Sequence, residues 1–584
     1  MQAQTQFQGP GSCHDLAALL LTEAVQHSLH TARLPVYVLL LDAKSAFDKV
    51  VLECAVRNAY LAGTRDQGLL YLNSRLQNRR TYVEWDKVLM GPICDSIGVE
   101  QGGVNSDRLY KLCNNVQLQT AQLSQLGVVM GAVIVSSIGQ ADDTALVSNC
   151  LTKLCGLLHL AVQYCKNYHV ELVPEKTKRL AFHPSGKDHG LYIQELLNPR
   201  QLDGHRINFS SSAEHVGILR SIEGNMPHVL SRLSAHTRAI GAILHTGMAG
   251  GHYGNPAASM RLQRLYGCPV LLSGLASLVL NKAEMSVIHH HLKVHLERIL
   301  KLHKSTPECV VMFLAGSLPA SALLHLKMLG LLGMIAHLGR DNILHQHGCQ
   351  VLLSNSPGKS WFSTLRSICK DYGLPDPLLV LQSPPSKDSW KRMTKSKVID
   401  FWEVRYRAQA TLLPSLKYFN SNYMSLTSPH PIFEAARSPF EVRKTIVVAK
   451  MLSGRYRTDQ LVRHWSKTNP LGLCLLPGCD GKSLGTLEHI LLYCQALKET
   501  RSHMMLHWFK FLSDRPYLFP LIVDLTSNES NFMQLLLDPS SIPSVKTANI
   551  LQPDCLKSCF YLSRTWVYSH HQKRTSLQKT WKLI

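Results

Sequence analysis

Asp42 is the first residue of this chain whose type and setting could support metal chemistry. It directly follows the apolar run Val36–Leu41, which predicts a buried strand because it is continuous and rich in strand-forming residues. A carboxylate at the end of a buried strand is unfavourable unless it is compensated, and a bound divalent cation would compensate it. The alternative is an acidic residue that caps the following helix.

Asp142 and Asp143 form a second acidic pair, between segments 128–136 and 145–147, which we predict to be strands around a polar turn. Two adjacent carboxylates at the tip of a hairpin suit hard cations, which prefer oxygen ligands. The alternative is an ordinary solvated Asp-Asp turn.

A glycine-rich segment lies between these acidic segments and precedes a predicted helix over Asp107–Gln119. It runs from Gln101 through Gly102 and Gly103 to Ser106. Glycine permits close approach of the backbone to a ligand or to a neighbouring chain, although a simple loop is the alternative. The three segments in this order would place Asp42 and Asp142 side by side across a sheet. Two metal ions about 3.5–4 Å apart could then hold the attacking and leaving oxygens of a phosphoryl transfer.

The three segments resemble the palm motifs of reverse transcriptases from non-LTR (LINE-type) retrotransposons. The resemblance implies that Asp42 and Asp142 bind two Mg²⁺ ions, or Mn²⁺, and that Asp143 supports them. It also implies substrate-binding roles for Phe47, Gln101, Gly102, Ser106 and Lys176. The segment Glu214–Gly217 resembles the family's primer-grip hairpin. The implied activity is RNA-directed DNA polymerisation, in which a primer 3′-hydroxyl attacks a deoxynucleoside triphosphate. The implied partners are an RNA template, including retroelement RNA, and a DNA primer.

Some positions differ from the family pattern. Gln140 stands where the family usually has Tyr or Phe, and Asp107 stands where Pro is common. Only 41 residues precede Asp42, which predicts an amino-terminally truncated protein without the endonuclease and most of the fingers. Such a chain is expected to bind an RNA–DNA or RNA duplex in a salt-dependent way and to extend a primer poorly. Two functions therefore remain open: a polymerase, and a catalytically inactive remnant that binds nucleic acid.

A compact set of cysteine and histidine residues predicts a zinc site near the carboxyl end. Its members are Cys474, Cys479, His489 and Cys494. Three thiolates and one imidazole suit tetrahedral zinc, and scattered buried thiols are the alternative. The resembled family carries a Cys-Cys-His-Cys knuckle after its thumb, usually with two residues between the first two cysteines, whereas this chain has four. A zinc-dependent nucleic-acid adaptor is a third possible function.

The composition fits an α+β protein with several domains. The chain has 584 residues, which predicts two to four domains, and a net charge of +22, which favours a polyanionic partner. We expect a reverse-transcriptase palm, an antiparallel sheet with helices, followed by a helical thumb and a small zinc knuckle. The expected boundaries are 1–220 for partial fingers plus palm, 221–350 for the thumb-like domain, 351–455 for a linker and helical region, 456–500 for the zinc-knuckle-like segment and 501–584 for a basic tail.

The sequence shows no apolar run of the roughly 20 residues that a membrane span needs. We expect an intracellular protein of the nucleus, the cytoplasm or both, not secreted, with its 16 cysteines mostly reduced. Nothing in the sequence indicates the oligomeric state.

Two further segments are open to more than one interpretation. The run His289–His291 is predicted to be a solvated or partly packed helix face, because adjacent helical residues point in different directions. The basic segment 564–582, with Trp566, Tyr568 and Trp581, suits single-stranded nucleic acid or an ordinary exposed terminus.

Overall fold

The chain divides into two compact units. The first unit comprises residues 1–232, 272–284 and 324–397, and the second comprises 233–271, 285–323 and 398–584. The computed structural model describes residues 14–77, 79–95, 97–100, 103, 105–183, 201–202, 205–245, 255–354, 359–436, 438–464 and 466–582. The domain boundaries expected from the sequence stay a prediction.

A five-stranded sheet forms the centre of the first unit. Its strands, in spatial order, are β13 (Asn208–Phe209), β10 (Lys178–Phe182), β1 (Val36–Leu41), β8 (Asp143–Ser148) and β7 (Ser137–Gln140). β1 pairs antiparallel with both β10 and β8, and all six of its residues are buried. The apolar run before Asp42 is therefore the central strand, as its composition predicts.

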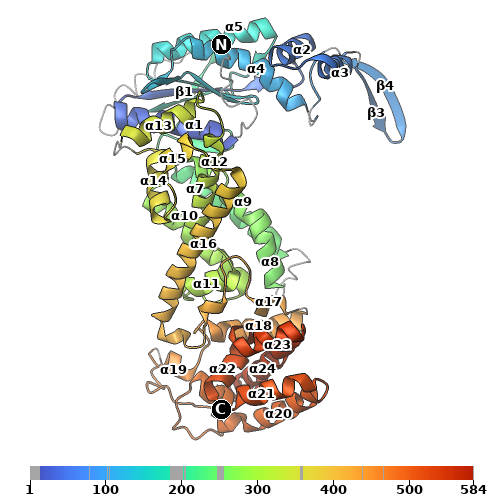
Figure 1. Ribbon diagram of the computed structural model, residues 1–584, viewed down its shortest axis with the longest axis vertical. Helices are drawn as coiled ribbons and strands as arrows, with labels where there is room; N and C mark the ends of the chain where they lie inside the picture. Colours follow the sequence, from blue (N-terminus) through green and yellow to red (C-terminus); the bar gives the residue numbers. More distant parts are fainter. Residues whose placement is uncertain are drawn as a thin grey trace. The chain divides into compact units, whose positions relative to one another are not determined.

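Helices cover both faces of this sheet (Figure 1). On one face, Tyr37, Leu39 and Leu41 pack with residues of α5 (Leu151–Tyr168) in a shared apolar cluster. Alternate residues of a strand face the same side, which explains the odd numbering of this set. On the other face lies α1 (His14–Gln26), whose apolar residues from Leu16 to Ala24 are buried. The mixed helices and antiparallel strands confirm the α+β class.

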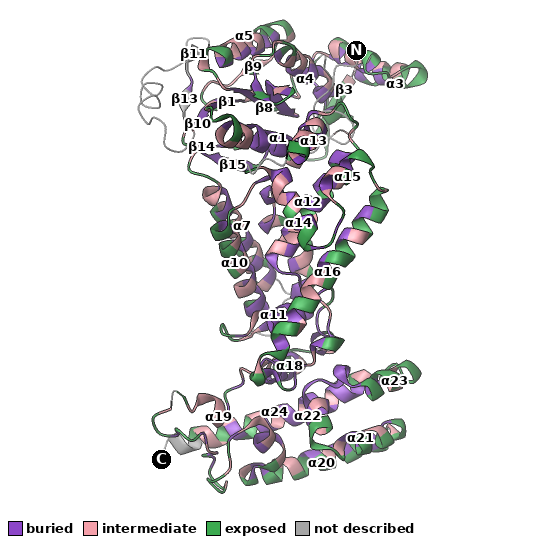
Figure 2. Cartoon of the chain, turned by 60° about the vertical axis from the view of Figure 1, so that its left-hand side comes forward, coloured by how far each residue is buried: buried purple, intermediate pink, exposed green. Residues whose placement is uncertain are grey.

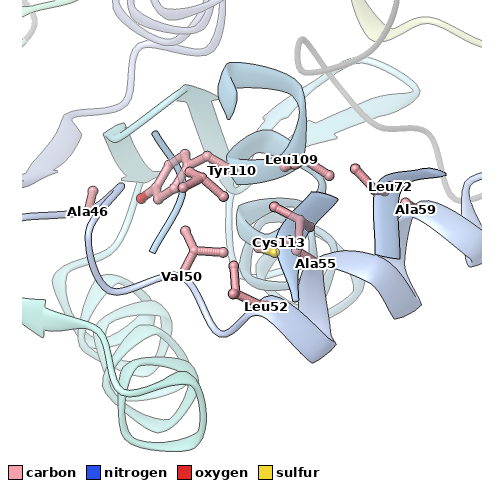
Figure 3. Packing of buried hydrophobic residues seen from close by; sticks show 11 residues of the cluster. Ala46, Val50, Leu52, Ala55, Ala59, Leu72, Leu109, Tyr110 and Cys113 are labelled. Carbon is pink, nitrogen blue, oxygen red and sulfur yellow. The ribbon is translucent and has the colours of Figure 1, made fainter. Parts of the chain in front are cut away.

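A second apolar cluster supports the segment after Asp42 (Figure 3). It joins α2 (Leu52–Leu61) and α3 (Asp66–Leu76) to α4 (Ser106–Leu123). The hairpin of β3 (Arg79–Trp85) and β4 (Val88–Asp95) follows α3 and exposes many large apolar side chains. The cluster fixes the start of α4, where the glycine-rich segment ends.

Smaller hairpins complete the strand content. They pair β2 (Ala43–Lys44) with β9 (Glu171–Leu172), β5 (Val128–Met130) with β6 (Val133–Val135), β11 (Gln201–Leu202) with β12 (His205–Arg206), and β14 (Ser212–His215) with β15 (Ile218–Ser221). The segment predicted as a single strand over 128–136 is thus a hairpin of its own, and the partner of β8 is β7.

Beyond β15, the described residues are mainly helical. The main helices are α7 (Met226–His245), α8 (Pro256–Leu262), α10 (Lys282–Leu300), α11 (Glu308–Ala315), α12 (Ala320–Ala336), α13 (Ile343–Ser354), α14 (Trp361–Asp371), α15 (Pro377–Gln382), α16 (Lys387–Thr411), α18 (Pro439–Leu452), α20 (Lys498–Ser513), α21 (Phe519–Thr526), α22 (Glu529–Leu537), α23 (Pro543–Leu551) and α24 (Cys555–Lys582). α7, α10 and α12 lie in the region 221–350, where a helical domain is expected from the sequence.

Two segments differ from their sequence interpretation. Residues 387–397, interpreted as part of a linker, form the first half of α16. The basic tail belongs to α24, which Figure 2 colours by burial. Trp566 and Arg564 are 2 % exposed each, and a guanidinium nitrogen of Arg564 lies 2.7 Å from Oε2 of Glu441. A helix that packs these residues into its own unit does not offer them to single-stranded nucleic acid.

In the part of the chain that the structure describes, no single helix is long and apolar enough to cross a membrane. Only α11 and α12 together reach such a length and composition, and they are bent by 58° at their junction.

Candidate active site and metal clusters

The three acidic residues lie at one end of the central sheet. In the β1–β8 pairing, Leu41 is opposite Thr144, so Asp42 extends beyond the last pair. In the β7–β8 pairing, Gln140 is opposite Asp143, and Ala141 and Asp142 form the turn between the strands. The strand that leads to Asp42 and the hairpin that carries Asp142 are therefore antiparallel neighbours.

The charges of these carboxylates act on one another. The pKa of the Asp143 carboxyl is raised above its usual range, first because the surrounding protein displaces water from it and then because Asp142 is negative. Asp42 raises this pKa further by the same repulsion. A divalent cation would relieve such repulsion, so the donor set fits Mg²⁺ or Mn²⁺. The carboxylate oxygens of Asp42, Asp142 and Asp143 do not all lie within 4.8 Å of one another. Among the described residues, sets of three or more potential metal ligands this close occur only in the two clusters that contain cysteine or histidine.

The turn that carries Asp142 is held from α4. Ala141 has a φ of +56°, which is the left-handed region, so the turn needs support from outside. Nδ2 of Asn114, which is buried, donates to the Ala141 carbonyl at 3.0 Å and lies 3.3 Å from Oγ1 of Thr144. Asn114 therefore fixes the turn on both sides of the acidic pair, a role that the sequence pattern did not reveal.

Lys176 lies beside Asp42. Its Nζ is 3.5 Å from Oδ2 of Asp42, and both side chains are partly exposed. The backbone ties the same loop to Asp42, because Val173 N donates to the Asp42 carbonyl at 2.9 Å and Lys176 N donates to the Val173 carbonyl at 3.2 Å. The structure thus brings together the lysine and the first acidic residue that the sequence singles out.

Phe47 packs against the apolar cluster of Figure 3, and Ser106 begins α4, the helix that supplies Leu109, Tyr110 and Cys113 to this cluster. The ring of Phe47 is half-buried and lies 5.0 Å from that of Tyr110, centroid to centroid. Ser106 is the buried first residue of α4, and a Cβ added to Gly103 would lie 2.6 Å from its Oγ. A side chain at position 103 would therefore have to displace the Ser106 hydroxyl. The predicted substrate residues Gln101 and Gly102 lie outside the described residues.

Gln140 and Asp107, the two departures from the family pattern, have defined surroundings. Gln140 is 5 % exposed and its Oε1 has no hydrogen-bond partner. An unpaired buried acceptor is unfavourable, and the aromatic ring usual at this position would not have one. Asp107 accepts from Nζ of Lys111 at 2.7 Å, one helical turn away on α4.

The segment that resembles a primer grip forms the β14–β15 hairpin. Val216 and Gly217 occupy its turn with φ values of 46° and 76°. His215 is buried without a partner for either ring nitrogen, and burial lowers its pKa to about 3, with the charge of Arg220 adding to the effect. Arg220 donates to Oγ1 of Thr22 at 2.8 Å, which fastens the hairpin to α1.

The four predicted zinc ligands converge in the second unit. One ligand atom from each of Cys474, Cys479, His489 and Cys494 lies within 4.8 Å of the others. Sγ of Cys474 is 3.8 Å from Sγ of Cys494, and Sγ of Cys479 is 3.4 Å from Nε2 of His489. A Cys₃His set of this size suits tetrahedral zinc.

Local backbone structure explains this convergence. His489–Tyr493 is a π-helix, and Cys494 N donates to the His489 carbonyl at 2.6 Å, so residues five apart share one face. On the other side, Cys474 N donates to the Ser483 carbonyl at 2.8 Å, which closes a loop around Cys479. The loop is long enough to absorb the four-residue spacing.

The His289–His291 run behaves only in part as predicted. Nε2 of His289 contacts Glu308 at 2.9 Å, and His290 is exposed. His291, however, approaches His236 and His295, with one ring nitrogen of each within 4.8 Å of the others. The sequence interpretation missed this cluster, because His236 is far away in the chain.

The amino-terminal part of the chain matches the model of a known protein family. Residues 1–208 match the family model described as reverse transcriptase (RNA-dependent DNA polymerase). No curated protein matches the chain. The match spans the central sheet from β1 to β13 and all three acidic residues. The first 208 residues of this chain are therefore similar to a reverse transcriptase domain.

Proposed function

We propose that the chain is an RNA-directed DNA polymerase of a non-LTR (LINE-type) retrotransposon. The observation that carries the proposal is the shared position of Asp42, Asp142 and Asp143 at one end of a sheet that lies within the reverse transcriptase match. In this proposal, Asp42 and Asp142 hold two divalent cations and Asp143 supports them. The cations would stabilise the charge that develops on the transferring phosphoryl group.

The remaining residues act on the substrates. Lys176, whose Nζ is already beside Asp42, contacts the triphosphate of the incoming nucleotide. Phe47 lies under the sugar, where its ring excludes a 2′-hydroxyl. Ser106 at the start of α4, with the preceding Gln101 and Gly102, contacts the template and the nucleotide. The net charge of +22 supports binding of a template–primer duplex through its phosphates.

We also propose that Cys474, Cys479, His489 and Cys494 hold one structural zinc ion. All four ligands are protein side chains, and Cys474 and Cys494 are fully buried, as is usual for closed structural sites.

A catalytically inactive remnant that binds nucleic acid is the second candidate function. Gln140 favours it, because this residue stands where the family usually has Tyr or Phe and its buried Oε1 has no hydrogen-bond partner.

Primer extension on an RNA template separates these functions. The polymerase extends the primer only with Mg²⁺ or Mn²⁺ and loses extension when Asp142 and Asp143 are both changed to Ala. The remnant binds the duplex, does not extend it, and is unaffected by the double change.

A further inference from the structure

Three histidines from two helices meet inside the second unit. His236 belongs to α7, and His291 and His295 belong to α10. Nδ1 of His236 lies 3.0 Å from Nε2 of His291. The ring centroids are 5.1 Å apart for His236 and His295 and 4.4 Å apart for His291 and His295. The three rings therefore surround one small volume.

Helical spacing explains how α10 supplies two of them. Residues four apart lie on the same face of an α-helix, so His291 and His295 point to the same side. His236 is 0 % exposed and His295 is 3 % exposed, whereas His291 is half-buried. A cation could reach the cluster past His291 while the other two rings stay dry.

A ring nitrogen of the cluster has no partner within the protein. Nδ1 of His295 is buried with no hydrogen-bond partner, which is an unfavourable state for an imidazole packed against two others. Imidazole binds a metal through the lone pair of a ring nitrogen. The cluster therefore holds a ligand nitrogen that the protein itself does not use.

An outer partner orients one of the rings. The side-chain amide of Gln263 lies against Nε2 of His236, with its Oε1 at 3.2 Å and its Nε2 at 2.9 Å. When Nε2–H of His236 donates a hydrogen bond to the Gln263 oxygen, Nδ1 of His236 carries no proton and faces His291. Metal-binding histidines are commonly held in this way by a hydrogen bond to their second nitrogen.

We propose that His236, His291 and His295 bind one zinc ion, separate from the cysteine-rich cluster. Zinc–imidazole bonds of about 2.0–2.1 Å at tetrahedral angles require ligand nitrogens about 3.3 Å apart. One ring nitrogen of each histidine lies within 4.8 Å of the others, and Nδ1 of His236 is 3.0 Å from Nε2 of His291. These separations lie on either side of the spacing that zinc requires.

Three protein ligands leave the fourth zinc position for water or another small ligand. Arg298, one turn beyond His295 on α10, opposes the cation by charge repulsion, but its side chain is exposed and solvent screens it. The zinc ion cross-links α7 and α10 within the second unit and thereby stabilises the packing of these helices.

Zinc content of the purified full chain tests the proposal. The Cys474→Ser/Cys494→Ser variant removes the cysteine-rich cluster, and we expect it to keep one zinc equivalent. Adding His291→Gln and His295→Gln should remove that equivalent, whereas adding His290→Gln, an exposed neighbour on the same helix, should not. Cobalt bound to the cysteine variant should lack the thiolate charge-transfer band that a Cys₃His site gives.

A second experiment tests the proposal even if the cysteine variant does not fold. In the otherwise unchanged chain, His291→Gln should lower the zinc content by one equivalent and lower the midpoint of thermal unfolding only when zinc is present. Equal zinc content in the unchanged chain, His291→Gln and His290→Gln, all folded by circular dichroism, would overturn the proposal and leave a packed histidine cluster.

Discussion

Nζ of Lys176 lies 3.5 Å from Oδ2 of Asp42 at the end of the central strand. The side chains are 70 % and 41 % exposed, and exposed ion pairs contribute only about 0–1 kcal/mol to stability. The pair therefore matters less for folding than for the charge that it places beside the proposed cation site. An incoming triphosphate would draw Lys176 away and leave Asp42 to the metal.

Changing Lys176 to Met should affect nucleotide use and leave the fold intact. We expect the unfolding free energy to change by less than about 1 kcal/mol and the KM for the nucleotide to rise roughly tenfold, as for loss of one charge-assisted hydrogen bond. Steady-state extension at varied nucleotide concentration measures this. Lys153→Met, exposed at the start of α5, is the matched control. A KM unchanged from that of the control would remove Lys176 from the triphosphate site.

Changing Asn114 to Leu should disturb the β7–β8 turn that carries Asp142, because Asn114 supports this turn from α4. The variant loses the donor to the partly buried Ala141 carbonyl and the contact with Thr144, and loss of a hydrogen bond of this kind costs about 0.5–1.5 kcal/mol. We expect lower stability in urea and a larger loss in kcat than in KM, because Asp142 is no longer positioned. Asn73→Leu, in α3 and away from the turn, is the control. Full activity with lowered stability would show that the turn needs no support from α4.

Stability should fall on acidification in part because of His215. Its folded pKa is about 3, so between the ordinary value of 6.5 and that value the unfolded chain binds more protons than the folded chain. Its contribution is complete above about pH 6.5 and is lost as the pH falls toward 3. Urea unfolding at pH 7 and pH 5 should therefore show a loss about 2 kcal/mol smaller in His215→Leu than in the unchanged chain. The exposed His290→Gln should behave like the unchanged chain, and an equal loss in all three would be evidence against this role.

Removal of zinc should loosen the segment around Cys474 and Cys494. A strong chelator should lower the midpoint of thermal unfolding, because zinc binds the folded site and not the unfolded chain. Cys494→Ser should bind less zinc and show a smaller response to the chelator. Cys150→Ser, an exposed cysteine remote in sequence from the cluster, should respond like the unchanged chain. If chelation leaves the unfolding of the unchanged chain as it was, the cluster is not a structural zinc site.

Local sequence patterns predict much of the first unit. The run Val36–Leu41 is the buried central strand, and the Asp-Asp pair follows a strand at a turn, because burial and turn chemistry are both set by neighbouring residues. The compact spacing of the four cysteine and histidine ligands likewise predicts their convergence.

Long-range packing explains what the patterns did not reveal. Asn114 reaches Ala141 across 27 positions, and His236 reaches His291 across 55, so no local period relates them. The basic residues of α24 are typical of an exposed segment in sequence. Arg564 is nevertheless buried, because the negative charge of Glu441 from another helix neutralises it. Charge alone does not indicate exposure when an opposite charge is supplied by a distant segment.

Metal-dependent primer extension by the Asp142→Asn variant tests the central claim most directly. The unchanged chain should add nucleotides to a DNA primer on an RNA template with Mg²⁺ or Mn²⁺, and Asp142→Asn should lose at least about a hundredfold in rate because it removes a metal ligand. Asp86→Asn, at the exposed β3–β4 turn, should retain the rate, and all three should bind the duplex equally. Extension that survives in Asp142→Asn, or duplex binding by the unchanged chain with no extension in either metal, would contradict the account.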